Sequence, residues 1–321
     1  MIKNLLRLMR PSDWVKNVFI LPALIFSLPN IIDTGRTDEL SGMVLATLWT
    51  VVAFSLLASG FYCINDAFDA EGDRRHPVKR KRPIASGEIA VGQGLGFGMF
   101  LVIVGLVIGF LVNLGVGCTL VTYAVLQFGY NGGLKRLMVV DAVTLAIGFS
   151  LRSAAGAFAI NVEVSAWLLG LVFFLTLYLA FIKRLCDLSS ARLADSDWKS
   201  PAGYDNPLEL NWLLSLSGVT VVLSWVLYAL SSHAMNLFQV RATGFALLTP
   251  LVLIVVHRFY QRANNGESDS PLSALREDRV VLVCMILFVV GVLASLYVPA
   301  VEEGLSMLIY QSPVESAGDG A

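Results

Sequence analysis

Three aspartates and one asparagine recur over a short stretch of the chain, at spacings that could bind a metal ion. The stretch carries Tyr62, Asn65, Asp66, Asp69 and Asp73. At about 100° per residue in an α-helix, these five side chains fall within an arc of roughly 100°. Carboxylates stacked this closely repel one another unless a cation neutralises them, and ligands made only of oxygen favour Mg²⁺. The sequence therefore predicts a Mg²⁺ site, the alternative being a solvated acidic helix end. The predicted metal ligands are Asn65, Asp66, Asp69 and Asp73, and the three aspartates are also the predicted catalytic residues.

A run of four cations follows the acidic stretch. Lys79 and Arg82 lie three residues apart, and an arginine can hold a phosphate group through two parallel hydrogen bonds. We expect Lys79 and Arg82 to contact phosphate oxygens, whereas Arg80 and Lys81 are equally consistent with basic charge at a membrane surface. Carboxylates beside cations are typical of a site in which Mg²⁺ and basic side chains share one diphosphate group.

The order of these residues also resembles a known signature. The chain is similar to the UbiA superfamily of intramembrane prenyltransferases in its first motif, which here reads Asn65-Asp66-x-x-Asp69-x-x-x-Asp73, then Pro77, Lys79 and Arg82-Pro83-Ile84-Ala85-Ser86-Gly87. The resemblance implies an all-α, UbiA-like bundle of membrane helices. It also implies a Mg²⁺-dependent transferase that acts on a diphosphate substrate and a polyprenyl lipid.

A second motif narrows the resemblance. Aromatic prenyltransferases of the superfamily usually carry a second aspartate-rich stretch, whereas this chain has Asp141 alone, with Lys135 and Arg152 as extra cations. In this respect it resembles the decaprenyl-phosphate phosphoribosyltransferase branch. Three other stretches resemble the same branch: Arg10-Pro11-x-x-Trp14-Val15-Lys16-Asn17, Lys183-Arg184, and Pro271-x-x-x-Leu275-x-x-Asp278-Arg279.

The extra cations fit the charge of the substrates that this branch implies. Phosphoribosyl diphosphate and a polyprenyl phosphate present a diphosphate, a 5-phosphate and an acceptor phosphate, which need more cations than one prenyl diphosphate does. Arg152 falls inside an apolar segment, and an intramembrane arginine is a functional hypothesis by default. A structural pair is the alternative for Arg152, and a charge in a cytoplasmic loop is the alternative for Lys135. The predicted substrate-binding residues are Lys16, Tyr62, Lys79, Arg82, Lys135, Asp141, Arg152, Lys183 and Arg184.

These expectations combine into one functional hypothesis. The protein would transfer 5-phosphoribose from phosphoribosyl diphosphate to a polyprenyl phosphate, giving polyprenyl-phosphoryl 5-phosphoribose and diphosphate for lipid-linked pentose and cell-envelope synthesis. One alternative is a UbiA-type prenyltransferase that moves a prenyl chain to an aromatic acceptor. A second is a transporter or channel, although its carboxylates should then lie near the bilayer midplane. We expect no nucleic-acid partner, and the sequence leaves a homo-oligomer open.

Composition indicates how these residues are held. Hydrophobic residues make up 56% of the 321 residues and charged residues only 15%, where a soluble domain carries about 25%. Such a chain is predicted to be a polytopic α-helical membrane protein, with one domain over residues 1–310 and a disordered tail over 311–321. We expect nine membrane spans, at about 15–33, 41–64, 93–113, 115–129, 137–160, 164–185, 208–232, 241–261 and 279–301.

Basic residues predict the orientation of the spans. Of the 23 lysines and arginines, only Arg36, Arg152 and Arg241 lie outside one set of connections. The positive-inside rule places that set in the cytoplasm, together with the acidic motif, in a cell inner (plasma) membrane. The connections concerned are the N-terminal segment and residues 65–89, 131–136, 183–207 and 258–279.

Overall fold

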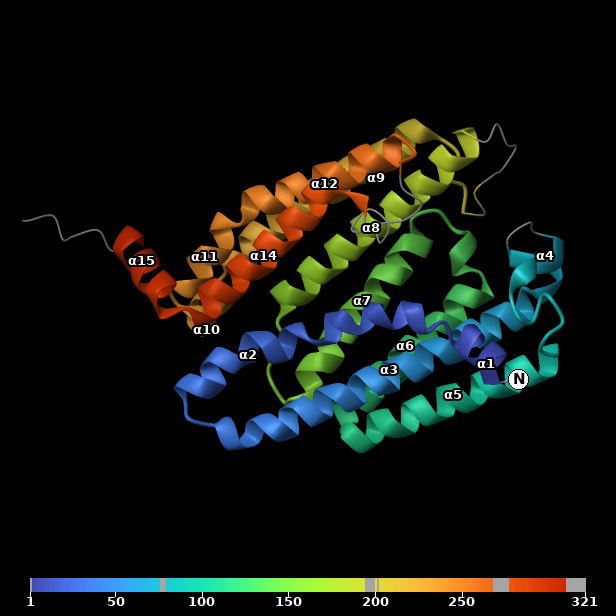
Figure 1. Cartoon of the computed structure of the whole chain (residues 1–321), viewed down its shortest axis with the longest axis horizontal. Coiled ribbons are helices and arrows are strands. Elements are labelled where there is room, and N and C mark those ends of the chain that lie inside the picture. The colour runs from blue at the N-terminus through green and yellow to red at the C-terminus, as the bar shows by residue number, and fades with distance from the viewer. Residues whose placement is uncertain (1, 76–78, 194–199, 201, 268–276, 310–321) are drawn as a thin grey trace, which may run out of the picture. The chain divides into compact units, whose positions relative to one another are not determined.

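The computed structural model is built from helices (Figure 1). Among the residues that it describes there is no β-strand, as the all-α prediction requires. The chain divides into two compact units, the first comprising Met1–Leu177 with Lys199–Tyr204 and the second Tyr178–Trp198 with Asp205–Ala321. The predicted tail at 311–321 lies outside the described residues, which are 2–75, 79–193, 200, 202–267 and 277–309.

Within these described ranges, eight helical segments are long and apolar enough to cross a membrane, which makes the chain a multi-pass membrane protein. Each overlaps one of the nine predicted spans. The ninth prediction, at 115–129, forms α6 (Leu114–Gly132), a helix of 19 residues that is not among these eight. The eight segments are Lys3–Asp33, Thr37–Phe68, Val91–Val112, Val140–Ala159, Ala166–Ser190, Pro207–Ala229, Arg241–Asn264 and Arg279–Tyr297.

The first unit contains the acidic motif, the basic run after it and the stretch from Lys135 to Arg152, and it begins with the short amphipathic helix α1. Its further elements are the 3₁₀ helix η1, the helices α2 to α7, the short 3₁₀ turns between them and the first part of α8. Their bounds are α1 Ile2–Met9, η1 Pro11–Ile20, α2 Pro22–Asp33, η2 Thr37–Glu39, α3 Leu40–Phe68, α4 Ala70–Arg75, η3 Lys79–Lys81, α5 Val91–Val112, η4 Leu134–Arg136, α7 Val140–Ala159 and α8 Ala166–Leu193.

Helix α3, which carries the acidic motif at its end, lies directly against α5 (Figure 1). Two glycines allow this approach. A Cβ atom on Gly60 would stand 2.6 Å from the carbonyl oxygen of Gly98, and one on Gly98 would stand 2.8 Å from that of Gly60. Membrane helices pack this closely where small residues such as glycine line both surfaces. The glycine pair therefore fixes the position of α3 five residues before Asn65.

Aromatic rings fill the space between α3 and α6. The Tyr123 ring packs edge-on against Phe54 at 5.5 Å and against Phe61 at 6.5 Å between ring centroids. All three side chains are buried, and edge-to-face pairs of this kind stabilise a core beyond the area that they bury. The tight turn into α6 is made by Asn113, whose side chain accepts a hydrogen bond from the Val116 amide.

The second unit contains the end of α8 and the helices α9 to α15. A buried tryptophan joins two of them, because the Trp225 indole nitrogen donates a hydrogen bond to the carbonyl of Phe245 at 3.0 Å. The bounds are α9 Pro207–Ala229, α10 Ser232–Phe238, α11 Arg241–Leu247, α12 Thr249–Asn264, α14 Arg279–Tyr297 and α15 Pro299–Ile309.

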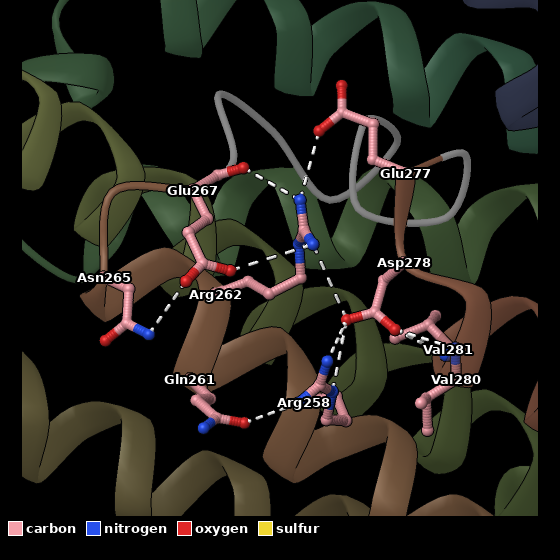
Figure 2. Close-up of polar contacts among 9 residues, drawn as sticks. All are labelled: Arg258, Gln261, Arg262, Asn265, Glu267, Glu277, Asp278, Val280 and Val281. Carbon is pink, nitrogen blue, oxygen red and sulfur yellow. Dashed lines mark hydrogen bonds and ion pairs between the residues drawn. The ribbon is translucent and has the colours of Figure 1, made fainter.

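An ion cluster fastens α12 to the start of α14 (Figure 2). The buried Asp278 caps α14 by accepting hydrogen bonds from the Val280 and Val281 amides. Its second oxygen accepts from Arg258 at 2.6 Å and lies 3.7 Å from Arg262. Burial raises the pKa of Asp278, but the bonds from the two amides and Arg258 outweigh burial and hold this pKa below its ordinary value.

Candidate active site

The acidic motif lies at the junction of α3 and α4. Helix α3 ends at Phe68. Asp69 is its C-cap residue and still has a helical backbone conformation. The Asp69 amide donates to the carbonyl of Asn65 at 2.9 Å, and the Asp73 amide donates to that of Asp69 at 2.8 Å. The helical path therefore continues through the motif, as the sequence predicts. Its side chains nevertheless divide into two groups with different surroundings.

The first group is an arginine–aspartate cluster made by Arg10, Asp66, Asp73 and Arg82. Asp66 and Asp73 are 2% and 5% exposed. One nitrogen of Arg82 bridges them, at 3.0 Å from Asp66 and 2.7 Å from Asp73. Arg10 donates to the same oxygen of Asp66 at 2.6 Å. Two carboxylates are thus neutralised by two guanidinium groups of the chain itself, which is how buried charges are tolerated.

Arg10 is a member of this cluster that is not among the predicted site residues. It has a left-handed backbone, with φ of 52°, between α1 and η1. Its guanidinium also stands over the Tyr62 ring, 4.9 Å from the ring centroid. Ser59 holds the preceding residue in place by donating to the carbonyl of Met9 at 2.8 Å. The sequence feature that could have indicated Arg10 is the Arg10-Pro11 pair, which begins one of the stretches that resemble the decaprenyl-phosphate phosphoribosyltransferase branch.

The second group is the Lys135 cluster, made by Asn65, Asp69 and Lys135. The Lys135 ammonium lies 3.3 Å from the side-chain oxygen of Asn65 and 3.4 Å from both carboxylate oxygens of Asp69. The Asp69 side chain is 40% exposed and that of Lys135 25% exposed. Unlike the first cluster, this one is open to ligands from outside, and its long contacts are weak.

The two clusters separate the four side chains that the sequence groups as metal ligands. Asn65 and Asp69 direct three oxygens at one cation, so their donor set fits a hard divalent ion. Asp66 and Asp73 already accept bonds from guanidinium groups. Within the part of the chain that the structure describes, no three His, Cys, Asp or Glu side chains are placed around one metal position. Asn65 and Asp69 are therefore the residues best placed to hold a metal.

Lys16, Tyr62 and Lys79 border these clusters. The Lys16 ammonium lies 2.7 Å from Asp13 and 3.4 Å from the Tyr62 hydroxyl. It also stands over the Tyr62 ring, so this predicted pair is brought together. Asp13, which is not among the predicted site residues, is a further charged neighbour of Lys16. Lys79 begins η3, and its carbonyl accepts a hydrogen bond from the Arg82 amide. The Lys79 side chain is exposed whereas Arg82 is partly buried, so these two predicted phosphate contacts differ in burial.

Two of the predicted substrate contacts, Asp141 and Arg152, are buried in this structure. Asp141 is fully buried, and its carboxylate accepts a hydrogen bond from the Tyr204 hydroxyl at 2.5 Å. Arg152 is 4% exposed and does not pair with Asp141. Its three nitrogens donate to Asn17, the Gly148 carbonyl and Tyr123 at 2.9, 2.8 and 3.1 Å. For Arg152 these bonds favour the structural alternative. The guanidinium also stands over the rings of Phe54, Tyr123 and Phe149.

The remaining predicted pair belongs to the second unit. Lys183 and Arg184 lie on α8, where both contact Asp187 within the same helix. The distances between charged atoms are 2.6 Å for Lys183 and 3.8 Å for Arg184. In helices such pairs contribute only a few tenths of a kcal/mol, roughly 0.3–0.5. Their predicted role in binding therefore remains a prediction.

Comparison with known proteins gives one consistent result. Residues 18–275 match the model of the UbiA prenyltransferase family. The chain is 30% identical over 303 residues to the decaprenyl-phosphate phosphoribosyltransferase of Corynebacterium glutamicum, covering 92% of this chain and 87% of the relative. It is 28% identical to the protein of the same name from Mycolicibacterium smegmatis, covering 92% and 93% of the two chains.

Solved structures agree at the level of the fold. A UbiA homolog from Archaeoglobus fulgidus bound to GPP and Mg²⁺ superposes with a TM-score of 0.65 and 18% identity, covering 94% of this chain and 99% of the other. A digeranylgeranylglyceryl phosphate synthase gives 0.63 and 17%, covering 92% and 98%. These values establish a shared arrangement of helices.

Proposed function

Because this chain belongs to the UbiA prenyltransferase family, we propose that it is a transferase that moves 5-phosphoribose from phosphoribosyl diphosphate to a polyprenyl phosphate. The products are polyprenyl-phosphoryl 5-phosphoribose and diphosphate. The observation that carries the proposal is the similarity to two phosphoribosyltransferases over most of this chain and most of theirs. That similarity extends over 92% of this chain in both cases.

The Lys135 cluster supplies groups for the departure of diphosphate. As the bond between the anomeric carbon and the diphosphate oxygen breaks, negative charge grows on the leaving group. Lys135 and the exposed Lys79 are cations that can neutralise this charge. A Mg²⁺ ion held by Asn65 and Asp69 would supply further charge neutralisation on the diphosphate. The arginine–aspartate cluster acts by holding the end of α3 in place.

The acceptor makes a general base unnecessary. A polyprenyl phosphate is already an anion, so one of its oxygens can form the new bond to the anomeric carbon without losing a proton. The electron pair of the broken bond leaves with the diphosphate. Catalysis then consists mainly of positioning and electrostatic stabilisation, which agrees with a site of lysines, arginines and carboxylates. By stabilising the departing diphosphate, the cations would favour a dissociative transition state in which the ribose centre has oxocarbenium character.

A donor assay tests the proposal. The purified protein in nanodiscs is given radiolabelled phosphoribosyl diphosphate with a polyprenyl phosphate, or a labelled prenyl diphosphate with an aromatic acceptor. We expect lipid-linked label only from the first pair, and only with a divalent cation present, Mg²⁺ being the most effective. Transfer from the prenyl donor alone would refute the proposal and identify a prenyltransferase. Turnover that persists in EDTA would refute the metal requirement.

We also propose that the site faces the cytoplasm from a plasma membrane, since basic residues border it. Single cysteines in place of Arg80 and Thr37 test this orientation in a Cys118→Ser background, because Cys118 is the exposed cysteine. A membrane-impermeant thiol reagent added to intact cells should label position 37 and reach position 80 only after permeabilisation. Labelling of both positions from outside would overturn the orientation.

A further inference from the structure

The segment between α6 and α7 carries Lys135 and has a strained backbone at its end. Val139, the last residue before α7, has φ of 68° and ψ of −43°. A positive φ is a genuine outlier for a β-branched side chain, since Cβ and the neighbouring carbonyl are crowded there. Such conformations persist only where surrounding contacts enforce them, and they gather at functional sites.

One side chain from a distant part of the sequence supplies that enforcement. The Tyr204 hydroxyl accepts a hydrogen bond from the Val139 amide at 2.8 Å and donates one to Asp141 at 2.5 Å. Tyr204 is 1% exposed and Asp141 0%. A single buried hydroxyl thus holds both the strained residue and the first turn of α7.

The other end of the segment is fixed as well. Gly133 follows α6 with φ of 151°, a conformation open to glycine, and its carbonyl accepts a bond from the Arg136 amide at 2.9 Å. The turn η4 between Gly133 and Leu137 contains Lys135, whose ammonium faces Asn65 and Asp69. The path of the backbone from Gly133 to Val139 therefore determines where that ammonium stands.

We infer that Tyr204 is a positioning residue for the diphosphate site, acting through Val139 and Asp141 on Lys135. This inference rests on the proposed function for the identity of the ligand, diphosphate, but its geometry is independent of the lipid acceptor. It also reassigns Asp141 from a substrate contact to the partner that orients the Tyr204 hydroxyl. The separation of 63 positions between Tyr204 and Asp141 explains why no local pattern reveals the link.

The variant Tyr204→Phe keeps the ring and removes both hydrogen bonds. We expect the affinity of the nanodisc-embedded protein for inorganic diphosphate with Mg²⁺, measured by calorimetry, to fall roughly tenfold, with a matching rise in KM for phosphoribosyl diphosphate. The matched control is Tyr178→Phe, which also removes a buried hydroxyl, one that donates to the Val256 carbonyl at 2.6 Å in the second unit. The control is expected to lower stability but not diphosphate affinity.

A double variant separates positioning from a general structural role. If Tyr204 acts through Lys135, then Tyr204→Phe should change diphosphate affinity little once Lys135→Ala is present. Equal losses of affinity with and without Lys135 would overturn the inference, as would unchanged affinity in Tyr204→Phe alone. A wild-type protein that binds diphosphate but does not transfer phosphoribose would contradict the proposed function only, so the two failures are distinguishable.

Discussion

Removal of Arg82 should destabilise the first unit strongly. The Arg82 guanidinium is the shared partner of Asp66 and Asp73, whose side chains are 3% and 6% exposed. In the variant Arg82→Ala, Asp66 keeps Arg10, but Asp73 loses a bond of 2.7 Å within a buried site. Breaking a buried ion pair from one side costs about 3–5 kcal/mol. Because the Arg82 side chain is itself 27% exposed, we expect the lower value, about 3 kcal/mol.

Chemical unfolding in detergent, followed by tryptophan fluorescence, measures this loss. The control is Arg75→Ala, which removes an arginine from an ion pair whose side chains are 81% and 83% exposed. Such pairs contribute about 0–1 kcal/mol, so the control should unfold like the wild type. The double variant Arg82→Ala with Asp73→Asn should regain a large part of the loss, since it removes the carboxylate left without its partner.

Two results would refute this reasoning. A loss below about 1 kcal/mol in Arg82→Ala would mean that Asp66 and Asp73 do not depend on the guanidinium and behave as a surface pair. A double variant no more stable than Arg82→Ala would mean that the arginine acts by its volume rather than its charge. Either outcome would return the two aspartates to the candidate metal ligands.

Three further outcomes follow from the same contacts. Asp69→Ala should abolish transfer and weaken Mg²⁺ binding while leaving the melting temperature unchanged, because its side chain is 40% exposed; a folded, active variant would exclude it from the site. Arg152→Ala should lower stability by about 3 kcal/mol without a selective rise in KM for the lipid phosphate, which a substrate contact would instead show. Asp278→Asn should remove stability that Asp278 provides above the ordinary aspartate pKa. Because the pKa of Asp278 is lowered in the folded protein, the difference in unfolding free energy between wild type and variant should vanish only as pH falls through that lowered, folded-state pKa. Unfolding free energies of the two proteins that never converge in acid would contradict this.

Much of the fold follows from local sequence. Apolar runs of sufficient length identify the membrane segments, and the spacing of Asn65, Asp66, Asp69 and Asp73 predicts the helical path through the motif. The apolar run at 115–129 predicts a helix, and the structure has α6 there, although α6 is not among the eight candidate spans.

The partners of the charged residues could not be predicted in the same way. Arg10 and Asp66 are 56 residues apart, and Arg152 and Asn17 are 135 apart. Helical periodicity relates residues a few positions apart, and it carries no information on contacts between distant helices. The sequence thus identified Arg152 as an intramembrane cation but could not reveal the ring of aromatic and polar groups around it. The left-handed backbones of Arg10 and Val139 are likewise consequences of tertiary contacts.

The division of the motif into two clusters explains how one helix end serves both stability and binding. Three carboxylates within a few turns would repel one another, yet Asp66 and Asp73 are compensated by guanidinium groups of the chain and need no outside cation. Asp69 differs because its ion-pair contact with Lys135 is long and its side chain is 40% exposed. A carboxylate in that position can exchange a weakly held ammonium for another cation at small cost, whereas the buried pair cannot. Asp69 is therefore the aspartate of the motif whose chemistry remains available to ligands.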